Sequence, residues 1–197
     1  MSRFQKRGSR FGTDDNESRA NRHAQGGRPL LKQEDELESF LESKKTPFVL
    51  ILDGVQDPHN LGACIRTANG AGVDAVIIPK DNAAPITDTV MSVSCGGASN
   101  TAIFRVVNIA RTMEKLKKIG VWIAGTSDKA DQDLYNSDLK GPVALVMGSE
   151  GKGMRRLTEE KCDFLLTIPM GGTVPCLNVS VATGVCLYEI VRQRAES

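Results

Sequence analysis

The sequence predicts an α/β fold with a mostly parallel sheet and helices on both faces. Short apolar runs rich in β-branched residues recur along the chain, and segments of helical composition separate them. The runs are continuously apolar, as expected for strands that a parallel sheet buries on both faces. Loops containing glycine or polar residues follow several of these runs, and α/β folds bind ligands at the carboxyl ends of their strands.

The composition excludes several classes of protein. Of 197 residues, 40% are hydrophobic and 25% are charged, which is ordinary for a globular chain. No apolar run reaches the roughly eighteen residues that a membrane span needs. The five cysteines are an odd number without any C-x-x-C pair, which argues against a disulfide framework or a zinc site. We therefore expect reduced thiols, a cytoplasmic protein, no membrane and no metal.

The first 32 residues differ in composition from the rest. They hold eight Lys or Arg against three Asp or Glu, with few large apolar side chains. Such a segment cannot bury enough surface to offset its ordering entropy, so we expect a disordered basic arm over 1–32. Its charge suggests a polyanionic partner, although a tail without a binding role has the same composition. A short helix and linker are expected over 33–47, and one domain over 48–197.

Strands and helices alternate within this domain. The run Phe48–Leu52 is the first strand, Pro79 follows the second, and Gly72 ends the helix between them. Helical spacing turns Met113 and Leu116 inward in a later helix. Strands are predicted at 48–52, 75–78, 103–106, 121–124, 143–147 and 166–168, and helices at 62–71, 87–94, 109–119, around 158–159 and from 177 to about 192.

The stretch 165–185 combines a strand, a glycine-rich loop and a polar pair at a helix start. Gly171 and Gly172 have no Cβ, so ligand atoms can reach the backbone of this loop. Asn178 and Ser180 open the apolar helix that follows, and two interpretations stand. The pair belongs to a small-ligand site, or Asn178 caps the helix and Ser180 satisfies a free N–H group.

A second glycine-rich sequence, Gly148–Gly153, follows the fifth strand. Its Gly-Lys precedes Gly153 and not Ser or Thr, so it is not a Walker A phosphate loop. A flexible turn would explain the glycines but not Glu150. We expect this acid, directly at the end of a strand, to serve a site or to orient another loop.

The third polar segment runs from Asp57 to Arg66. Asn60 can cap the helix that follows, and Arg66 lies about one and a half turns farther on. Arg66 is either a surface charge or a phosphate-binding fork, and spacing alone favours the surface charge. A lone histidine such as His59 is more often structural than catalytic, and the sequence predicts no Ser/His/Asp set and no pair of catalytic carboxylates.

Together these three segments resemble the signature motifs of the SpoU-type (TrmH-like) RNA ribose 2′-O-methyltransferases of the SPOUT superfamily. The motifs read NLGACIRTA from Asn60, LVMGSEGKGM from Leu145 and IPMGGTVPCLNVSVA from Ile168, in the order and at the spacing of the family. The resemblance extends from Leu52 to Arg194 and is strongest to the bacterial 23S rRNA guanosine-2′-O-methyltransferases.

The resemblance implies a deep trefoil knot near the C-terminus and a homodimer, neither of which the residue pattern predicts. It also implies S-adenosylmethionine as cofactor, RNA as substrate and methylation of a ribose 2′-hydroxyl, with a guanosine of 23S rRNA as the first candidate. A tRNA ribose methyltransferase and a non-catalytic RNA-binding ribosome-assembly factor are the alternatives. The resemblance places the cofactor against the backbone near Gly125, Thr126, Gly148, Ile168, Met170 and Leu177.

The catalytic set that the resemblance implies has five members. Asn60 and Arg66 would reach the site across the dimer interface, to join Glu150, Asn178 and Ser180. The guanidinium of Arg66 is a poor base because its pKa exceeds about 12. We therefore expect Arg66 to stabilise the developing alkoxide and to hold the adjacent phosphate, while a role as proton acceptor stays open.

The sequence departs from the family at two places. Where the related rRNA enzymes carry a small RNA-binding domain, this sequence has the basic arm, so either the arm replaces that domain or the RNA target differs. Pro175-Cys176 stands where Ser-Ser is expected before Leu177 and Asn178. Proline fixes φ and removes an N–H donor, so the cofactor loop is expected to be more rigid.

Overall fold

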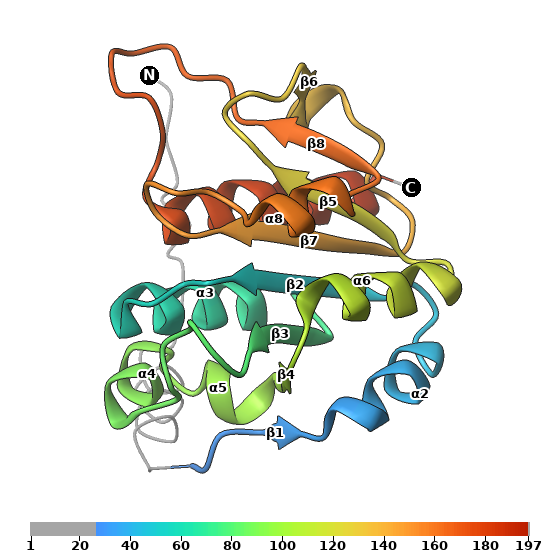
Figure 1. Ribbon diagram of the computed structural model, residues 1–197, viewed down its shortest axis with the longest axis vertical. Coiled ribbons are helices and arrows are strands. Elements are labelled where there is room, and N and C mark those ends of the chain that lie inside the picture. Colours follow the sequence, from blue (N-terminus) through green and yellow to red (C-terminus); the bar gives the residue numbers. More distant parts are fainter. Residues whose placement is uncertain (1–26, 197) are drawn as a thin grey trace, which may run out of the picture.

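The computed structural model describes residues 27–196, so most of the predicted basic arm lies outside the described residues. One sheet runs through the molecule in the strand order β1-β4-β3-β2-β7-β5-β8-β6. Figure 1 shows these strands stacked from β1 at one end to β6 at the other. Every pairing is parallel, which confirms the predicted class of sheet. The strands are β1 Leu31–Lys32, β2 Phe48–Asp53, β3 Ala75–Pro79, β4 Ala102–Val106, β5 Trp122–Thr126, β6 Gln132–Asp133, β7 Val143–Gly148 and β8 Phe164–Thr167.

Helices cover both faces of this sheet, as predicted. Alternate side chains of β2 enter two separate cores, because successive residues of a strand point to opposite faces. Helices α3, α4, α5 and α8 pack on one face, and α2 and α6 on the other. None of the helices over 27–196 is long and apolar enough to cross a membrane. The helices are α2 Leu37–Glu42, α3 Pro58–Gly70, α4 Asp88–Val93, α5 Gly97–Asn100, α6 Ile109–Lys118, α7 Arg156–Glu160 and α8 Val179–Ala195, with 3-10 turns at Glu34–Glu36 and Leu134–Asn136.

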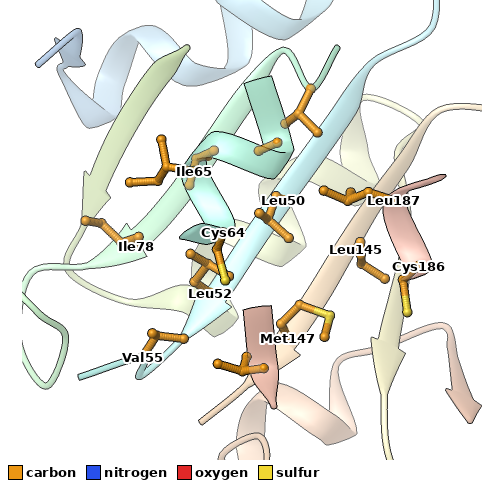
Figure 2. Packing of buried hydrophobic residues seen from close by; sticks show 14 of the residues in the cluster. Leu50, Leu52, Val55, Cys64, Ile65, Ile78, Leu145, Met147, Cys186 and Leu187 are labelled. Carbon is orange, nitrogen blue, oxygen red and sulfur yellow. The ribbon is translucent and has the colours of Figure 1, made fainter. Parts of the chain in front are cut away.

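The first core fixes how α3 and α8 lie against the centre of the sheet. Leu50 and Leu145 project from neighbouring strands, and Ile65 and Leu187 face them from the two helices (Figure 2). All four side chains are completely buried. Complete burial of a leucine or isoleucine contributes about 1.5–3 kcal/mol to the free energy of unfolding. This core therefore holds the starts of α3 and α8 near the carboxyl edge of the sheet.

The central strands end together at that edge. In the register of β2 and β7, Asp53 lies opposite Gly148, and β5 pairs with both β7 and β8. The loops that follow β2, β5, β7 and β8 consequently meet at one place. The loops after β7 and β8 contain Glu150 and Asn178, two of the residues in the predicted catalytic set.

The structure differs from the sequence predictions at several short elements. Leu31 and Lys32, expected within the disordered arm, pair with Ile103 and Phe104 of β4 and so form the edge strand β1. The pairing occupies backbone groups that β4 would otherwise leave open, and composition carries no signal for such a tertiary contact. The strand β6 and the helix α5 are only two and four residues long. Elements this short have no recognisable periodicity in the sequence, so the pattern does not predict them.

Candidate functional site

Asn178 connects the three polar segments at the carboxyl edge of the sheet. As the N-cap of α8, its Oδ1 accepts hydrogen bonds from Ser180 N at 2.9 Å and from Ser180 Oγ at 2.6 Å. Its Nδ2 donates to Asn60 Oδ1 at 3.0 Å and also to Glu150 Oε1. The two interpretations of Asn178 and Ser180 are therefore compatible, because one amide caps the helix and joins a polar cluster.

Glu150 reaches this cluster from a tight loop after β7. Ser149 and Gly153 exchange backbone hydrogen bonds of 3.0 and 2.9 Å, which close the loop around Glu150. Gly148 allows the closure: a Cβ at this position would lie 2.2 Å from the carbonyl carbon of Gly153 and from the nitrogen of Met154. The glycines of this segment thus permit close backbone packing, which presents a carboxylate to α8.

Asn60 lies in the first turn of α3 and is not its cap. The helix begins four residues earlier than predicted, at Pro58, because Asp57 accepts a hydrogen bond from His59 N at 3.0 Å. Proline at the first helical position is common because its missing N–H would have no helical partner there. The structure also places Asn60 in the cluster of its own chain, while the resemblance implies that Asn60 acts across a dimer interface.

The contact between α3 and α8 sets the distance between Asn60 and Asn178. Cys64 Sγ and Thr183 Oγ1 lie 3.5 Å apart in the buried contact, and Thr183 also donates to Val179 O at 2.7 Å. Burial raises the pKa of the Cys64 thiol from 9.0 to about 11. The thiol therefore stays protonated near neutral pH and serves packing, not chemistry.

Arg66 is the one predicted catalytic residue that the cluster does not include. Six residues at about 100° each turn its side chain about 120° around α3 from Asn60. The side chain is exposed, and it makes no hydrogen bond or ion pair with any residue between 27 and 196. A free, exposed guanidinium can bind a phosphate or another charged group that approaches from outside.

A cavity of about 780 Å³ opens beside the cluster, between the ends of β5, β7 and β8. Five of the six residues expected at the cofactor line it: Thr126, Gly148, Ile168, Met170 and Leu177. Gly125 lies underneath, where a Cβ would be 2.6 Å from Cys162 Sγ and 2.8 Å from Met154 Cε. Its lack of a side chain thus makes room for the loop that forms the cavity wall.

A second cavity of about 280 Å³ adjoins the first. Its walls are the loop after β2, the start of α3 and the loop after β7. Glu150 and Lys152 line both cavities, and Asn60 lines only the smaller one. The polar cluster therefore stands at the boundary between a larger, partly apolar cavity and a smaller polar one.

A model of the SpoU rRNA Methylase family matches residues 47–188. The chain belongs to this family. The match covers all three polar segments, so the resemblance drawn from the motifs is confirmed. SpoU relatives include the 23S rRNA (guanosine-2'-O-)-methyltransferase RlmB of Pseudomonas aeruginosa, 60% identical over 162 residues. RlmB of Escherichia coli K12 is 56% identical over 163 residues.

The SpoU relatives are longer than this chain. The alignments cover 82% and 83% of the chain, but 65% of the P. aeruginosa protein and 67% of the E. coli protein. The chain thus spans about two thirds of the length of these relatives.

Solved SpoU structures share the fold. AviRb from Streptomyces viridochromogenes in complex with AdoMet is 27% identical, with a TM-score of 0.74 over 81% of this chain and 62% of that one. An AdoMet-bound rRNA methyltransferase from Sinorhizobium meliloti is 28% identical, with a TM-score of 0.72 over 85% and 61%. The A. aeolicus TrmH/SpoU tRNA modifying enzyme is 28% identical, with a TM-score of 0.70 over 91% and 84%.

The sequence patterns did not predict the contact between Asp53 and Arg155, which lies next to this SpoU site. Asp53, at the end of β2, is buried, and its carboxylate accepts hydrogen bonds from the backbone N and from Nε of Arg155. A signal was present, because an acid that directly follows a buried strand must find a partner. The identity of that partner, 102 residues later, depends on the fold.

Proposed function

We propose that this protein transfers the methyl group of S-adenosylmethionine to the ribose 2′-hydroxyl of a guanosine in 23S rRNA. The observation that carries the proposal is the meeting of the three SpoU motifs at Asn178, between two adjoining cavities. The relatives named as 23S rRNA guanosine methyltransferases, up to 60% identical, support this RNA and this nucleotide.

The larger cavity suits the cofactor in size and chemistry. Its volume of about 780 Å³ lies within the usual range for small-molecule sites. Apolar side chains such as Met147, Ile168 and Leu177 offer contact area for an adenine ring, and Glu150 offers a negative charge near a positively charged sulfonium. S-adenosylmethionine supplies a methyl group activated by its bond to that sulfonium sulfur.

The smaller cavity is the proposed place of the target nucleotide. The amide of Asn178 holds Glu150 and Asn60 at its wall, so the polar groups are oriented before RNA arrives. We assign the exposed Arg66 to the phosphate next to the target ribose and to the developing alkoxide. We assign the amide of Asn178, which lines the larger cavity, and the hydroxyl of Ser180, which is bonded to it at 2.6 Å, to the orientation of Glu150 and Asn60.

The proposal includes a homodimer. Val181 and Tyr188, two turns apart on α8, are exposed at 52% and 53% although they are large and apolar. A surface of this kind suits a second copy of the chain. In such a dimer the free Arg66 would serve the partner's site while Asn60 serves its own.

Sedimentation tests this part of the proposal. A double change of Val181 and Tyr188 to Glu is expected to give monomers, and a dimer that persists in that variant would remove this surface from the proposal. Mixing an Arg66→Ala chain with a Glu150→Ala chain is expected to restore part of the activity, because one site of each mixed dimer keeps both residues.

A trefoil knot and a cytoplasmic location also belong to the proposal. In the sheet β5 lies between β7 and β8, whereas along the chain β7 lies between β5 and β8. Such crossed connections, together with membership of the SpoU family, support a threaded C-terminal end. Tracing the chain path in an experimental electron-density map tests the knot directly.

Transfer of labelled methyl from S-adenosylmethionine to total rRNA and tRNA, followed by mapping of ribose methylation, tests the function. Label at one guanosine of 23S rRNA is the expected result. Label only in tRNA would favour the alternative that the likeness to the A. aeolicus tRNA modifying enzyme supports. Cofactor binding without any label would favour an RNA-binding assembly factor.

A further inference from the structure

The carboxylate of Asp53 is buried at the carboxyl end of β2, where both of its oxygens bind Arg155. Its side chain has no exposed surface, whereas that of Arg155 is 51% exposed. Asp53 Oδ2 accepts the backbone N–H of Arg155 at 2.9 Å, and Oδ1 accepts Nε at 2.7 Å with the second guanidinium nitrogen at 2.5 Å. One carboxylate thus binds both the backbone and the side chain of the same arginine, which is a geometrically demanding contact.

The pair closes the two ends of the loop that carries Glu150. The loop leaves the sheet after Gly148, which lies opposite Asp53 in the register of β2 and β7. It returns at Arg155, which Asp53 holds. Between these points the backbone of Ser149 and Gly153 is bonded to itself. Glu150 therefore lies on a short closed loop whose two ends, at Gly148 and Arg155, are both held next to Asp53 at the end of β2.

The same pair joins the two walls of the smaller cavity. Gly54 and Val55, directly after Asp53, form one wall, and Ser149, Glu150 and Lys152 form the other. The second wall also borders the larger cavity. A shift of the loop would consequently move Glu150 away from Asn178 and alter both cavities together.

We propose that Asp53 and Arg155 are a positioning pair that sets the loop Ser149–Met154 for cofactor binding and methyl transfer. Neither residue has to touch a reacting atom, because the effect passes through the backbone of the loop to Glu150. The inference rests on the proposed function for its catalytic consequence. Its structural part, that the pair orders this loop, stands without it.

The test compares Asp53→Asn with Asp163→Asn. Asn at position 53 has the shape of Asp and keeps an acceptor for the N–H of Arg155, but it lacks the charge. Asp163 is a matched control, because its carboxylate also binds a backbone N–H (Ile123 N, 2.8 Å) and a cation (Lys117, 2.7 Å). It lies directly before β8, at the amino edge of the sheet, whereas the cavities open at the carboxyl edge.

Both variants are expected to lower the melting temperature, since each leaves a cation without its carboxylate. Only Asp53→Asn is expected to weaken S-adenosylmethionine binding, by about tenfold or more, and to speed amide hydrogen exchange over 149–155. Arg155→Lys keeps a positive charge but loses Nε, and an intermediate effect on both readouts is expected.

Wild-type exchange over 149–155 in Asp53→Asn would overturn the proposal. Equal loss of cofactor affinity in Asp163→Asn would also overturn it, since the effect would then be one of general stability. Exchange is measured without cofactor, so it still decides whether the pair orders the loop if the wild-type protein fails to bind S-adenosylmethionine. That last failure would count against the proposed function alone.

Discussion

Asn178 Nδ2 lies 3.0 Å from Asn60 Oδ1, although 118 residues separate the two along the chain. The bond joins the first turn of α3 to the N-cap of α8, and the same amide nitrogen also reaches Glu150. A side-chain amide has two N–H groups, so Asn178 can serve both acceptors at once. The polar cluster is thus complete within one chain, apart from Arg66.

Replacing Asn178 by Ala is expected to reduce methyl transfer by about 10²-fold or more, because Glu150 and Asn60 lose the group that orients them. The change also removes the cap of α8, at a cost of about 1 kcal/mol in the free energy of unfolding. Asn108→Ala is the control, since Asn108 caps α6 through Arg111 N at 3.0 Å, away from the cavities. Equal activity in the two variants would contradict a role for Asn178 beyond capping.

Arg66→Ala is expected to lower methyl transfer by about 10²-fold with cofactor binding unchanged. Because the side chain is exposed, the free energy of unfolding should change by no more than about 0.5 kcal/mol. Arg156→Ala serves as the control, since Arg156 is 82% exposed and pairs with Glu160. Rates with rRNA and thermal melts of both variants measure the difference, and full methylation by Arg66→Ala would remove Arg66 from the catalytic set.

Gly148→Ala is expected to destabilise the protein by about 2 kcal/mol or more and to abolish cofactor binding. The new Cβ would lie 2.2 Å from the backbone of Gly153 and Met154, so the loop of Glu150 would have to move. Gly141→Ala is the control, because a Cβ there meets nothing within 4 Å. Urea unfolding and calorimetric titration with S-adenosylmethionine distinguish the two, and wild-type binding by Gly148→Ala would refute the close-packing argument.

The buried thiols predict a loss of stability in alkali. Burial raises the pKa of Cys64 to about 11 and that of Cys186 to about 12, from 9.0. The folded chain keeps these protons while the unfolded chain releases them near pH 9. Stability is therefore unaffected below the unfolded pKa and falls as the pH rises toward the folded values.

The fall in stability is measured as the difference between the urea unfolding midpoint at neutral pH and the midpoint at a pH between the unfolded value of 9.0 and the folded value of about 11 for Cys64. Cys64→Ser, whose hydroxyl does not titrate in this range, should show a smaller drop than the wild type. A drop of the same size in both proteins would show that Cys64 does not contribute.

Deleting residues 1–26 is expected to weaken RNA binding by about tenfold at low salt and to reduce the dependence of the affinity on salt, because Lys and Arg release counterions from phosphates. The deletion should stop before Leu31, since Leu31 and Lys32 pair with β4. Changing every Lys and Arg of 1–26 to Gln keeps the length and should have the same effect. Unchanged affinity and salt slope in both variants would show that the arm does not bind RNA.

The sequence by itself determined the class of fold and the membership of the SpoU family. Continuous apolar runs such as Phe48–Leu52 identify buried parallel strands, because only such strands need no polar face. The three motifs could also be recognised from the sequence, because the glycines and polar residues of each motif lie next to one another along the chain. Local signals missed short elements and tertiary contacts, such as the four-residue helix α5 and the pairing of Leu31 with β4.

The tertiary structure alone decided which of the motif residues meet. In the folded chain Asn178 bonds to Asn60 and Glu150, whereas Arg66 lies outside this cluster. The fold also brings Arg155 into contact with Asp53. It also assigned Gly125 to packing beneath the cavity. These outcomes depend on the strand order and on how α3 and α8 pack, and both arise from contacts between residues far apart in sequence. A local pattern specifies the residues that can form a site, but the long-range packing sets their distances.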